Sequence, residues 1–451
     1  MKFLFQPVSI ASLIFFRIIF GILAFVDVLN TWVYYHLTVG AFNPERFQFR
    51  YYGFEWTKPI PEPWMSIFFI GLMLVALCIA FGYKYRLMSW VFAFGFSYTY
   101  FLEKAFYLNH GYLFCWICFV MALLPAHRAL SVDVKLRPEL KVSTIPFWCL
   151  FILPFMMGVV YFYGGIAKIN PDWLQGVPLK IWLKNKADLF LIGPLIAKEG
   201  TAYFMSYGGL LLDLLAVFFL LNKRTRIWVF GFILFFHGMN HLVFNIGIFP
   251  FLSIALTALY FPPDFPEKIG LRLAKRWQWL QRFIARQPKP SVTPVPLWQE
   301  QATLRPVIAA GLGVIIAIHL LLPLRHHLFP GDVAWTEEGH RYSWRMMLRS
   351  KQGYGTFTIV DKTTGEKEKI QPRDHLQNKQ HRKLYTHPDM ILQFAHYLRD
   401  QKLAEGQEVE VYADIKVKLN GGEYQRFIDP GVDLAAVEWQ FFRSAEWILH
   451  L

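Results

Sequence analysis

The chain has 451 residues, of which 55% are hydrophobic and only 17% are charged, and its formal net charge is +14. Length alone would suggest several soluble domains, but long apolar runs exclude that organisation and indicate an integral membrane protein. Lysines and arginines are distributed between these runs. That distribution indicates membrane orientation and argues against nucleic-acid binding.

Nine apolar runs of helical length predict nine membrane spans, of which the third and eighth are short. They cover residues 9–29, 64–82, 88–102, 111–127, 145–166, 203–221, 227–247, 248–261 and 304–323. We expect a polytopic α-helical membrane protein with about 8–9 spans. Its transmembrane domain is predicted over residues 1–323. This includes a cytoplasmic amphipathic and linker segment at 262–303.

Positive charge between the spans predicts the orientation. The connections after the second, fourth, sixth and eighth runs are rich in lysine and arginine, which places them and the N-terminus in the cytoplasm. Segment 266–286 has an apolar stripe between basic residues, so it is predicted either to lie on anionic lipid or to pack on the bundle. The proline-rich stretch 287–296 reads as a linker. We expect a bacterial inner membrane.

The polar residues 324–451 are predicted to form an extracytoplasmic α+β domain. Alternating and β-branched segments are separated by turns at Gly365 and at Asn420-Gly421-Gly422, and one segment has helical periodicity. The strands are predicted over residues 356–360, 366–370, 408–418 and 424–428, and the helix over residues 389–398.

Four cysteines lie inside apolar runs, which favours small core thiols over a disulfide framework. They are Cys78, Cys115, Cys118 and Cys149. The CxxC spacing of Cys115 and Cys118 is weak evidence for a metal or redox site, because no second pair accompanies it.

Ionisable and polar residues within the spans are functional candidates, because their burial in lipid is costly. Lys168 ends the fifth run. It is predicted either to snorkel towards the headgroups or, shielded from water, to serve as an uncharged base. The predicted orientation places several polar side chains near its depth: Asn109, His110, His237, Asn240 and His241.

Two further pairs allow alternative interpretations. His237 and His241 have i, i+4 spacing, but without a neighbouring glutamate we expect hydrogen-bonding histidines and no metal. Arg17 and Asp213 lie near mid-depth on the first and sixth runs. We expect them to form a structural ion pair, with a proton relay as the alternative.

Nine segments in collinear order resemble the vitamin K-dependent γ-glutamyl carboxylase family, whose membrane part is also called the horizontally transferred transmembrane domain. They are RIIFG (17–21), NHGYL (109–113), SVD (131–133), YFYGGIAKINPDW (161–173), GGLLLDL (208–214), HGMN (237–240), FNIGIF (244–249), YSWRMM (342–347) and FIDPGVD (427–433). The resemblance covers essentially the whole chain.

The resemblance implies a quinol site and its residues. The implied catalytic residues are Lys168, as the base, Asn109, His110 and His237. The implied cofactor-binding residues are Asn240, His241 and Tyr163. The cofactor is reduced vitamin K, with O2 and CO2 as co-substrates and no metal. Expected partners are membrane lipid, the quinol and a glutamate-containing protein or peptide on the extracytoplasmic side.

The implied chemistry is consistent with a lysine base. A hydroquinone hydroxyl has a pKa of about 10, as a phenol does, so an uncharged amine can remove its proton. The γ-hydrogen of a glutamyl residue is a far weaker acid. In this family, the reaction of the deprotonated quinol with O2 supplies the stronger base, and the quinol ends as an epoxide.

The substrate region is expected to contain Trp344, Met346, Met347, Arg349, Arg382 and Arg426. The three arginines are predicted either to bind a carboxylate or to be surface charges. The chain departs from the family pattern here: Ala167 replaces a second lysine, His340 a tyrosine, Arg349 a histidine and Gly431 an arginine. It also ends soon after Trp439 and Trp447, so most of the animal enzyme's luminal part is expected to be absent.

These departures leave three predicted functions. The first is glutamyl carboxylation coupled to quinol epoxidation. The second is quinol oxygenation that serves another substrate without carboxylation of glutamate. The third is a non-enzymatic scaffold or transporter, although a one-sided pocket without inverted symmetry argues against a transporter.

Overall fold

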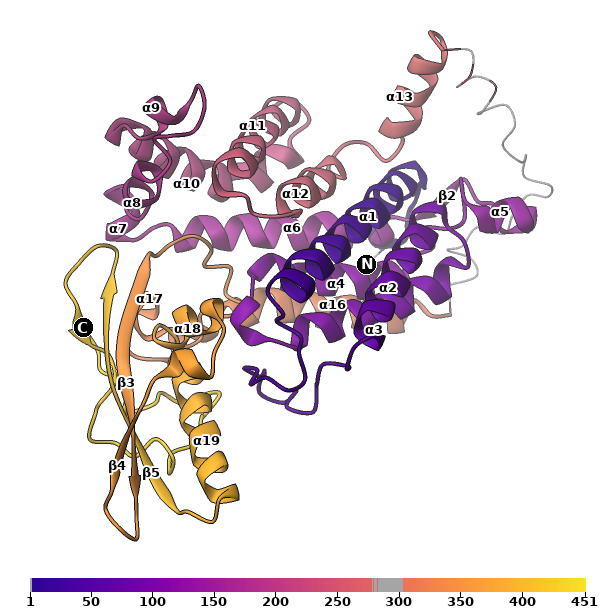
Figure 1. Ribbon diagram of the computed structural model, residues 1–451. Coiled ribbons are helices and arrows are strands. Elements are labelled where there is room, and N and C mark those ends of the chain that lie inside the picture. The colour runs from indigo at the N-terminus through magenta and orange to yellow at the C-terminus, as the bar shows by residue number, and fades with distance from the viewer. Residues whose placement is uncertain (1, 278, 280–281, 283–302) are drawn as a thin grey trace.

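The computed structural model describes residues 2–277, 279, 282 and 303–451. It has a helical part and, beside it, a C-terminal region built on a small sheet (Figure 1). Nine helices occupy the nine predicted runs. They are α1 (Ala11–Asn30), α2 (Trp64–Phe81), α3 (Tyr85–Phe101), α4 (Asn109–Leu123), α6 (Trp148–Ala167), α10 (Glu199–Leu221), α11 (Arg226–Phe244), α12 (Phe249–Ala258) and α16 (Arg305–Leu321).

Six of the helices described by the structure are long and apolar enough to cross a membrane. They are α1 with its continuation to Thr38, α2, α6, α10, α11, and α16 with its continuation to Leu328. The ten residues of α12 rise only about 15 Å, half of a hydrocarbon core of about 30 Å, so the predicted eighth crossing is not a full one. The predicted fold class is confirmed, whereas the orientation depends on the crossing count and stays a prediction.

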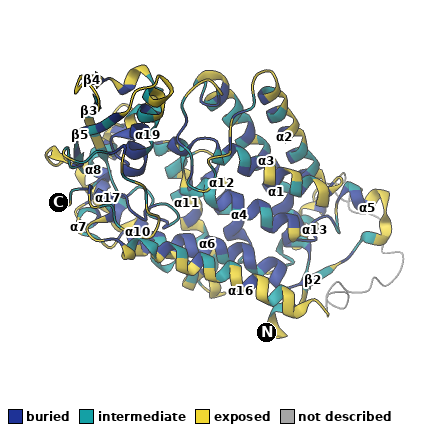
Figure 2. Cartoon of the chain, turned by 90° about the horizontal axis from the view of Figure 1, so that it is seen from below, coloured by how far each residue is buried: buried dark blue, intermediate teal, exposed yellow. Residues whose placement is uncertain are grey.

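Helix α6 is the most buried of these six helices (Figure 2). Its end packs closely on α10, because a Cβ atom on Gly165 would lie 2.6 Å from the backbone nitrogen of Leu214. Glycine is therefore required for this approach. The contact sets the relative depth of α6 and α10, and with it the neighbours of Lys168.

The C-terminal region confirms the predicted α+β pattern. Its antiparallel sheet has the order β4-β3-β5-β6, with β3 (Lys351–Asp361), β4 (Lys367–Ile370), β5 (Val409–Leu419) and β6 (Gln425–Arg426). Alternate residues of β5, from Val409 to Val417, are buried. Helix α19 (Pro388–Ala404) supplies the other half of this core, and the short helix α18 (Asn378–Leu384) precedes it.

Polar contacts tie the helical part to the C-terminal region at η3 (Lys104–Phe106), the turn between α3 and α4. The Glu103 carboxylate accepts hydrogen bonds from the Phe49 amide at 3.2 Å and from Gln380 Nε2 at 2.7 Å. Lys104 Nζ lies 2.6 Å from Asp389 Oδ2. Because these groups are buried, the junction is held by specific pairing as well as by apolar contact.

Helix α13 (Phe265–Ala274) forms the start of the predicted amphipathic segment and projects away from the bundle (Figure 1). Ile269 and Leu273, from the predicted apolar stripe, are exposed. The start of this helix contacts α1, because the rings of Phe265 and Phe15 lie 5.8 Å apart, whereas its apolar stripe is not covered by the described residues. Part of segment 266–286 and the whole proline-rich stretch 287–296 lie outside the described residues.

Candidate functional site

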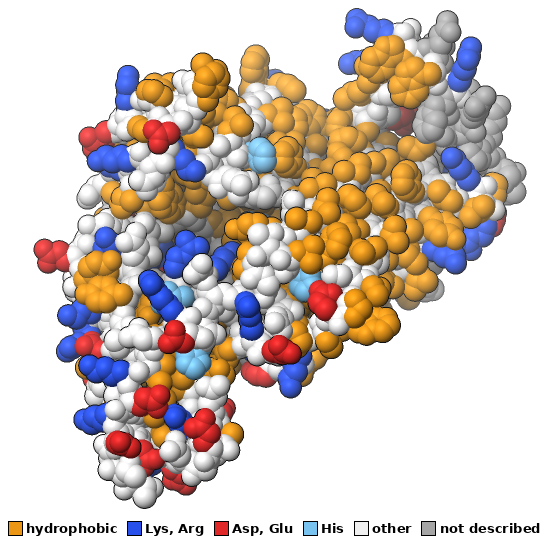
Figure 3. Space-filling model, in the orientation of Figure 1, with side chains coloured by type: hydrophobic (Ala, Val, Ile, Leu, Met, Phe, Trp, Pro, Cys, Tyr) orange, Lys and Arg blue, Asp and Glu red, His pale blue; other side chains and the backbone are white. Residues whose placement is uncertain are grey.

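A cavity of about 280 Å³ lies between the helical part and the C-terminal region. In the space-filling view, a hollow between the two parts contains lysine and arginine side chains (Figure 3). The cavity walls come from α6, α10, α11, the start of α4, the loop after α17 (Val333–Thr336) and the α18–α19 turn. Segments distant in the sequence thus enclose one space.

Lys168 follows α6 directly and lines this cavity. Its Nζ lies 2.6 Å from Asp213 Oδ2 and 3.2 Å from the Gly164 carbonyl oxygen, and 5.3 Å from the centre of the Trp173 ring. The whole residue is only 6% exposed, as is Asp213. The ammonium is therefore turned inward onto a carboxylate, which argues against snorkelling.

The predicted Arg17–Asp213 ion pair is wrong. The Arg17 guanidinium donates instead to the carbonyl oxygens of Ala126, Ala129 and Leu130. Helix α10 begins at Glu199, four residues earlier than predicted, and it packs on the end of α6. Because Gly165 lies against Leu214, the neighbouring Asp213 is level with Lys168, and its carboxylate pairs with that amine.

His237 faces the same cavity and is fixed by a residue that sequence reasoning missed. Its Nε2 lies 2.9 Å from the Tyr161 hydroxyl, which is 3.2 Å from Thr257 Oγ1. Nδ1 of His237 is buried and makes no hydrogen bond with the described residues. The only prior signal for Tyr161 was its place at the start of the Lys168 motif.

An aromatic ring, Phe249, connects the two cavity histidines. The His110 ring stacks on it with centroids 5.2 Å apart, and the His237 ring meets it edge-on at 5.9 Å. Asn109 also lines the cavity, and its Oδ1 accepts a hydrogen bond from the Tyr107 hydroxyl at 2.8 Å. The four predicted catalytic residues therefore surround one space.

The predicted cofactor-binding residues separate. Asn240 lines the cavity, three residues after His237 on the same helical face. His241 packs against Phe251 instead, and Tyr163 donates to the Leu320 carbonyl oxygen at 2.6 Å. Neither is among the cavity-lining residues. A cofactor-binding role for these two residues stays a prediction.

The predicted substrate residues separate as well. Met346, Met347 and Arg349 line the cavity, whereas Trp344 is packed behind it against the Tyr112 ring. Arg382 lines hollows outside the cavity.

Arg426 is not at the site. It lies on the edge strand β6, half-exposed, with Nε 3.2 Å from Asp414 Oδ1. Because β6 is the edge strand and pairs with β5, this position favours the predicted alternative of a surface charge.

Glu337 is an internal carboxylate that engages Arg349. The guanidinium donates to both carboxylate oxygens through Nε and Nη2, and Lys351 Nζ lies 3.6 Å from Oε1. Burial would raise the pKa of Glu337, but the charges of Arg349, His340 and Lys351 hold it at about 2. Burial lowers the pKa of Lys351 to about 7, because it outweighs the opposing effect of the Glu337 charge. Sequence reasoning missed Glu337 because no local pattern distinguishes it.

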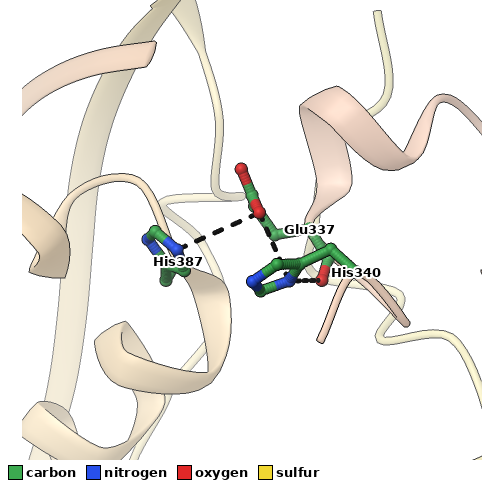
Figure 4. A group of neighbouring side chains, drawn as sticks. All are labelled: Glu337, His340 and His387. Atoms are coloured by element: carbon green, nitrogen blue, oxygen red, sulfur yellow. Dashed lines mark hydrogen bonds and ion pairs between the residues drawn. The ribbon is translucent and has the colours of Figure 1, made fainter. Parts of the chain in front are cut away.

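Two histidines complete this cluster (Figure 4). His340 Nδ1 and His387 Nε2 lie 3.3 Å and 4.0 Å from Glu337 Oε2, and one donor atom of each of the three residues lies within 4.8 Å of the others. Such a set can bind a metal ion. Here Arg349 already neutralises the carboxylate with two hydrogen bonds, so a dication would compete with it. The expectation that no metal binds stays a prediction.

A second buried charge cluster lies at the cavity wall around Asp389. Its carboxylate is 2.6 Å from Lys104 Nζ and 2.7 Å from Arg341 Nη1. Burial would raise the pKa of Asp389, but Arg341 and Lys104 lower it well below its usual range. Burial in turn lowers the pKa of Lys104 to about 8, against the opposing effect of Asp389. The cluster fixes the α3–α4 turn against α19.

Comparison with known families gives two matches. Residues 5–265, more than half of the chain, match the family model described as HTTM domain. The chain belongs to the HTTM domain family. Residues 304–451 match the model described as vitamin K-dependent gamma-carboxylase, lumenal domain. Together the matches confirm the predicted resemblance to the vitamin K-dependent carboxylase family. No solved structure matches the chain.

The two matched regions meet at the cavity. The HTTM domain contributes Lys168, Asp213 and His237, and the region matched to the lumenal domain contributes Met346, Arg349 and Lys383. The six candidate spans and the HTTM match show an integral membrane protein. The cavity therefore combines residues from the helical part with residues from the polar region.

Proposed function

We propose that this protein carboxylates glutamyl residues of a protein or peptide, coupled to the epoxidation of vitamin K hydroquinone by O2. The observation that carries the proposal is the buried Lys168–Asp213 pair, which faces a cavity lined by aromatic, aliphatic and histidine side chains. The family matches support the same chemistry. The C-terminal region would then face the extracytoplasmic side, in a bacterial inner membrane.

The cavity fits a reduced naphthoquinone. Phe236, Phe249 and Met157 offer apolar surface to a flat ring system. His237 offers a buried Nδ1 that no described residue bonds, so a quinone oxygen would satisfy it. Bound there, the quinol would supply the reducing equivalents and, with O2, a base stronger than any amine.

The Lys168–Asp213 pair removes the hydroxyl proton. The proposed step starts from one exchangeable proton on the pair, whose Nζ and Oδ2 atoms lie 2.6 Å apart. Because both side chains are buried, transfer of that proton to the carboxylate leaves an uncharged amine without a buried charge pair. The amine then accepts the proton from the ligand, so that the pair holds two. Asp213 thus holds the proton that Lys168 gives up before it acts as the base.

Two cations are available for a substrate carboxylate. Arg345 and Lys383 line the cavity, and neither forms an ion pair with a carboxylate among the described residues. Arg349, predicted for this role, is already held by Glu337. A glutamyl side chain entering from the C-terminal region would therefore meet Arg345 and Lys383 first.

One reconstitution tests the proposal. The full chain in lipid nanodiscs is incubated with reduced vitamin K, O2, labelled bicarbonate and a glutamate-rich peptide. Epoxide together with label fixed in the peptide is the expected result. If neither epoxide nor fixed label forms, the proposal is refuted. Lys168→Ala should abolish epoxide formation, whereas Lys180→Ala, at a partly buried lysine that pairs with Glu199 outside the cavity, should not. Full epoxide formation by Lys168→Ala would refute the base assignment.

The second candidate function is quinol oxygenation that serves another substrate. The observation that favours it is the capture of Arg349 by Glu337 within the region expected to bind glutamate. In the same reconstitution this function would give epoxide without label fixed in the peptide.

A further inference from the structure

A row of basic side chains leads from the outside of the protein to the cavity. Lys379 and Arg382 line two neighbouring hollows, one of which contains Arg46 and the other Arg349 and Lys351. Lys383 lines the second of these hollows and also the main cavity. We name Lys379, Arg382 and Lys383 the α18 strip. It connects the outer hollows to the cavity through shared residues.

The α18 strip carries positive charge that the protein leaves uncompensated. None of its three residues forms an ion pair with a carboxylate in the part of the chain that the structure describes. Glu337, the carboxylate that acts on Lys383, is occupied by Arg349, and Glu103, which acts on Lys379, accepts hydrogen bonds from Gln380 and Phe49. Burial, and then repulsion from Lys383 and Arg382, lowers the pKa of Lys379 to about 8. A protein retains such repulsion at a cost that a bound anion would offset.

The strip is also positioned and not simply solvated. Lys379 Nζ lies 4.4 Å from the Phe106 ring centre and 4.9 Å from that of Tyr35, so rings of the helical part hold its charge in place. Lys379 and Lys383 are one helical turn apart, about 6 Å. Alternate side chains of an extended chain repeat at about 6.6–6.8 Å, so their spacing matches that of the two lysines.

We infer that the α18 strip docks an extended acidic segment of a polypeptide and leads its carboxylates into the cavity. That the delivered carboxylates are substrates rests on the proposed function, whereas binding of the acidic segment does not depend on it. An acidic polypeptide fits better than a single small anion, because the basic residues continue along three hollows that share lining residues.

Binding is tested without quinol, O2 or bicarbonate, so failure of the carboxylase proposal would leave this test intact. The full chain in neutral-lipid nanodiscs is titrated against a fluorescent glutamate-rich peptide and a glutamine-rich peptide of the same length. Lys379→Glu/Arg382→Glu should weaken binding of the acidic peptide about tenfold or more and reduce its salt dependence. Lys379→Gln/Arg382→Gln, a milder change, should weaken it less.

The control is Lys362→Glu/Lys369→Glu, which places the same charge change on two exposed lysines of the β3–β4 hairpin. It should leave binding unchanged. Equal affinity of wild type and Lys379→Glu/Arg382→Glu for the acidic peptide would overturn the inference. A second outcome would also overturn it. If spin-labelled phosphatidylglycerol is added to the nanodiscs and Lys379→Glu/Arg382→Glu loses binding of this lipid but not of the peptide, the strip is a lipid headgroup site.

Discussion

Replacing either member of the Lys168–Asp213 pair should destabilise the protein more than replacing both. The two side chains are each 8% exposed and their charged atoms are 2.6 Å apart. Removing one partner leaves a buried group without its counter-charge, which costs about 3–5 kcal/mol. Lys168→Met/Asp213→Leu removes both charges and keeps the apolar volume. Its stability should therefore lie within about 1 kcal/mol of wild type.

The assay is reversible unfolding by SDS in mixed micelles, followed by tryptophan fluorescence. The double-mutant cycle should give a coupling energy of at least about 3 kcal/mol. Lys268→Met is the matched control, because it breaks the exposed i, i+4 pair with Asp264. That change should cost less than about 0.5 kcal/mol. Single variants that each cost under about 1 kcal/mol, with costs that add in the double variant, would refute a coupled buried pair.

Three further predictions follow from the packing and the charge clusters. Gly165→Ala should abolish epoxide formation by forcing α6 from α10, whereas Gly208→Ala, which has open space, should retain it; equal activities would contradict this account. Glu337→Gln should lower the free energy of unfolding above pH 4.5, because folding lowers the pKa of the Glu337 carboxyl from 4.5 to about 2. The difference from wild type should shrink as the pH falls towards 2, and a pH-independent difference would count against this account. Tyr161→Phe should raise the KM for reduced quinone about 3–10-fold through loss of the hydroxyl that fixes His237, and an unchanged KM would exclude that role.

The periodicity of the sequence was sufficient to predict the helices and strands. Apolar runs near 20 residues must become helices in lipid, because the backbone has no other way to satisfy its hydrogen bonds there. Alternation along β5 predicts a strand with one buried face in the same way. The length of α12 was overestimated because apolar residues continue past the point where its helix ends.

The motifs also predicted a common location for Lys168, Asn109, His110 and His237, since the family's residues were matched one by one. They did not separate Asn240 from His241, because adjacent helical residues differ by about 100° in direction and the true facing of α11 depends on its neighbours. A small rotation of the helix decides which of the two reaches the cavity.

The sequence by itself thus determined a helical membrane bundle, a polar α+β region and the residue types of the candidate site, since each follows from local periodicity or from a contiguous motif. Only the tertiary structure decided the ionic partners. Asp213 binds Lys168 and not Arg17 because Gly165 allows α6 to approach α10 at one depth. Glu337 occupies Arg349 because the loop after α17 folds back towards the start of β3. Pairing across distant segments depends on depth and rotation, which no local pattern specifies.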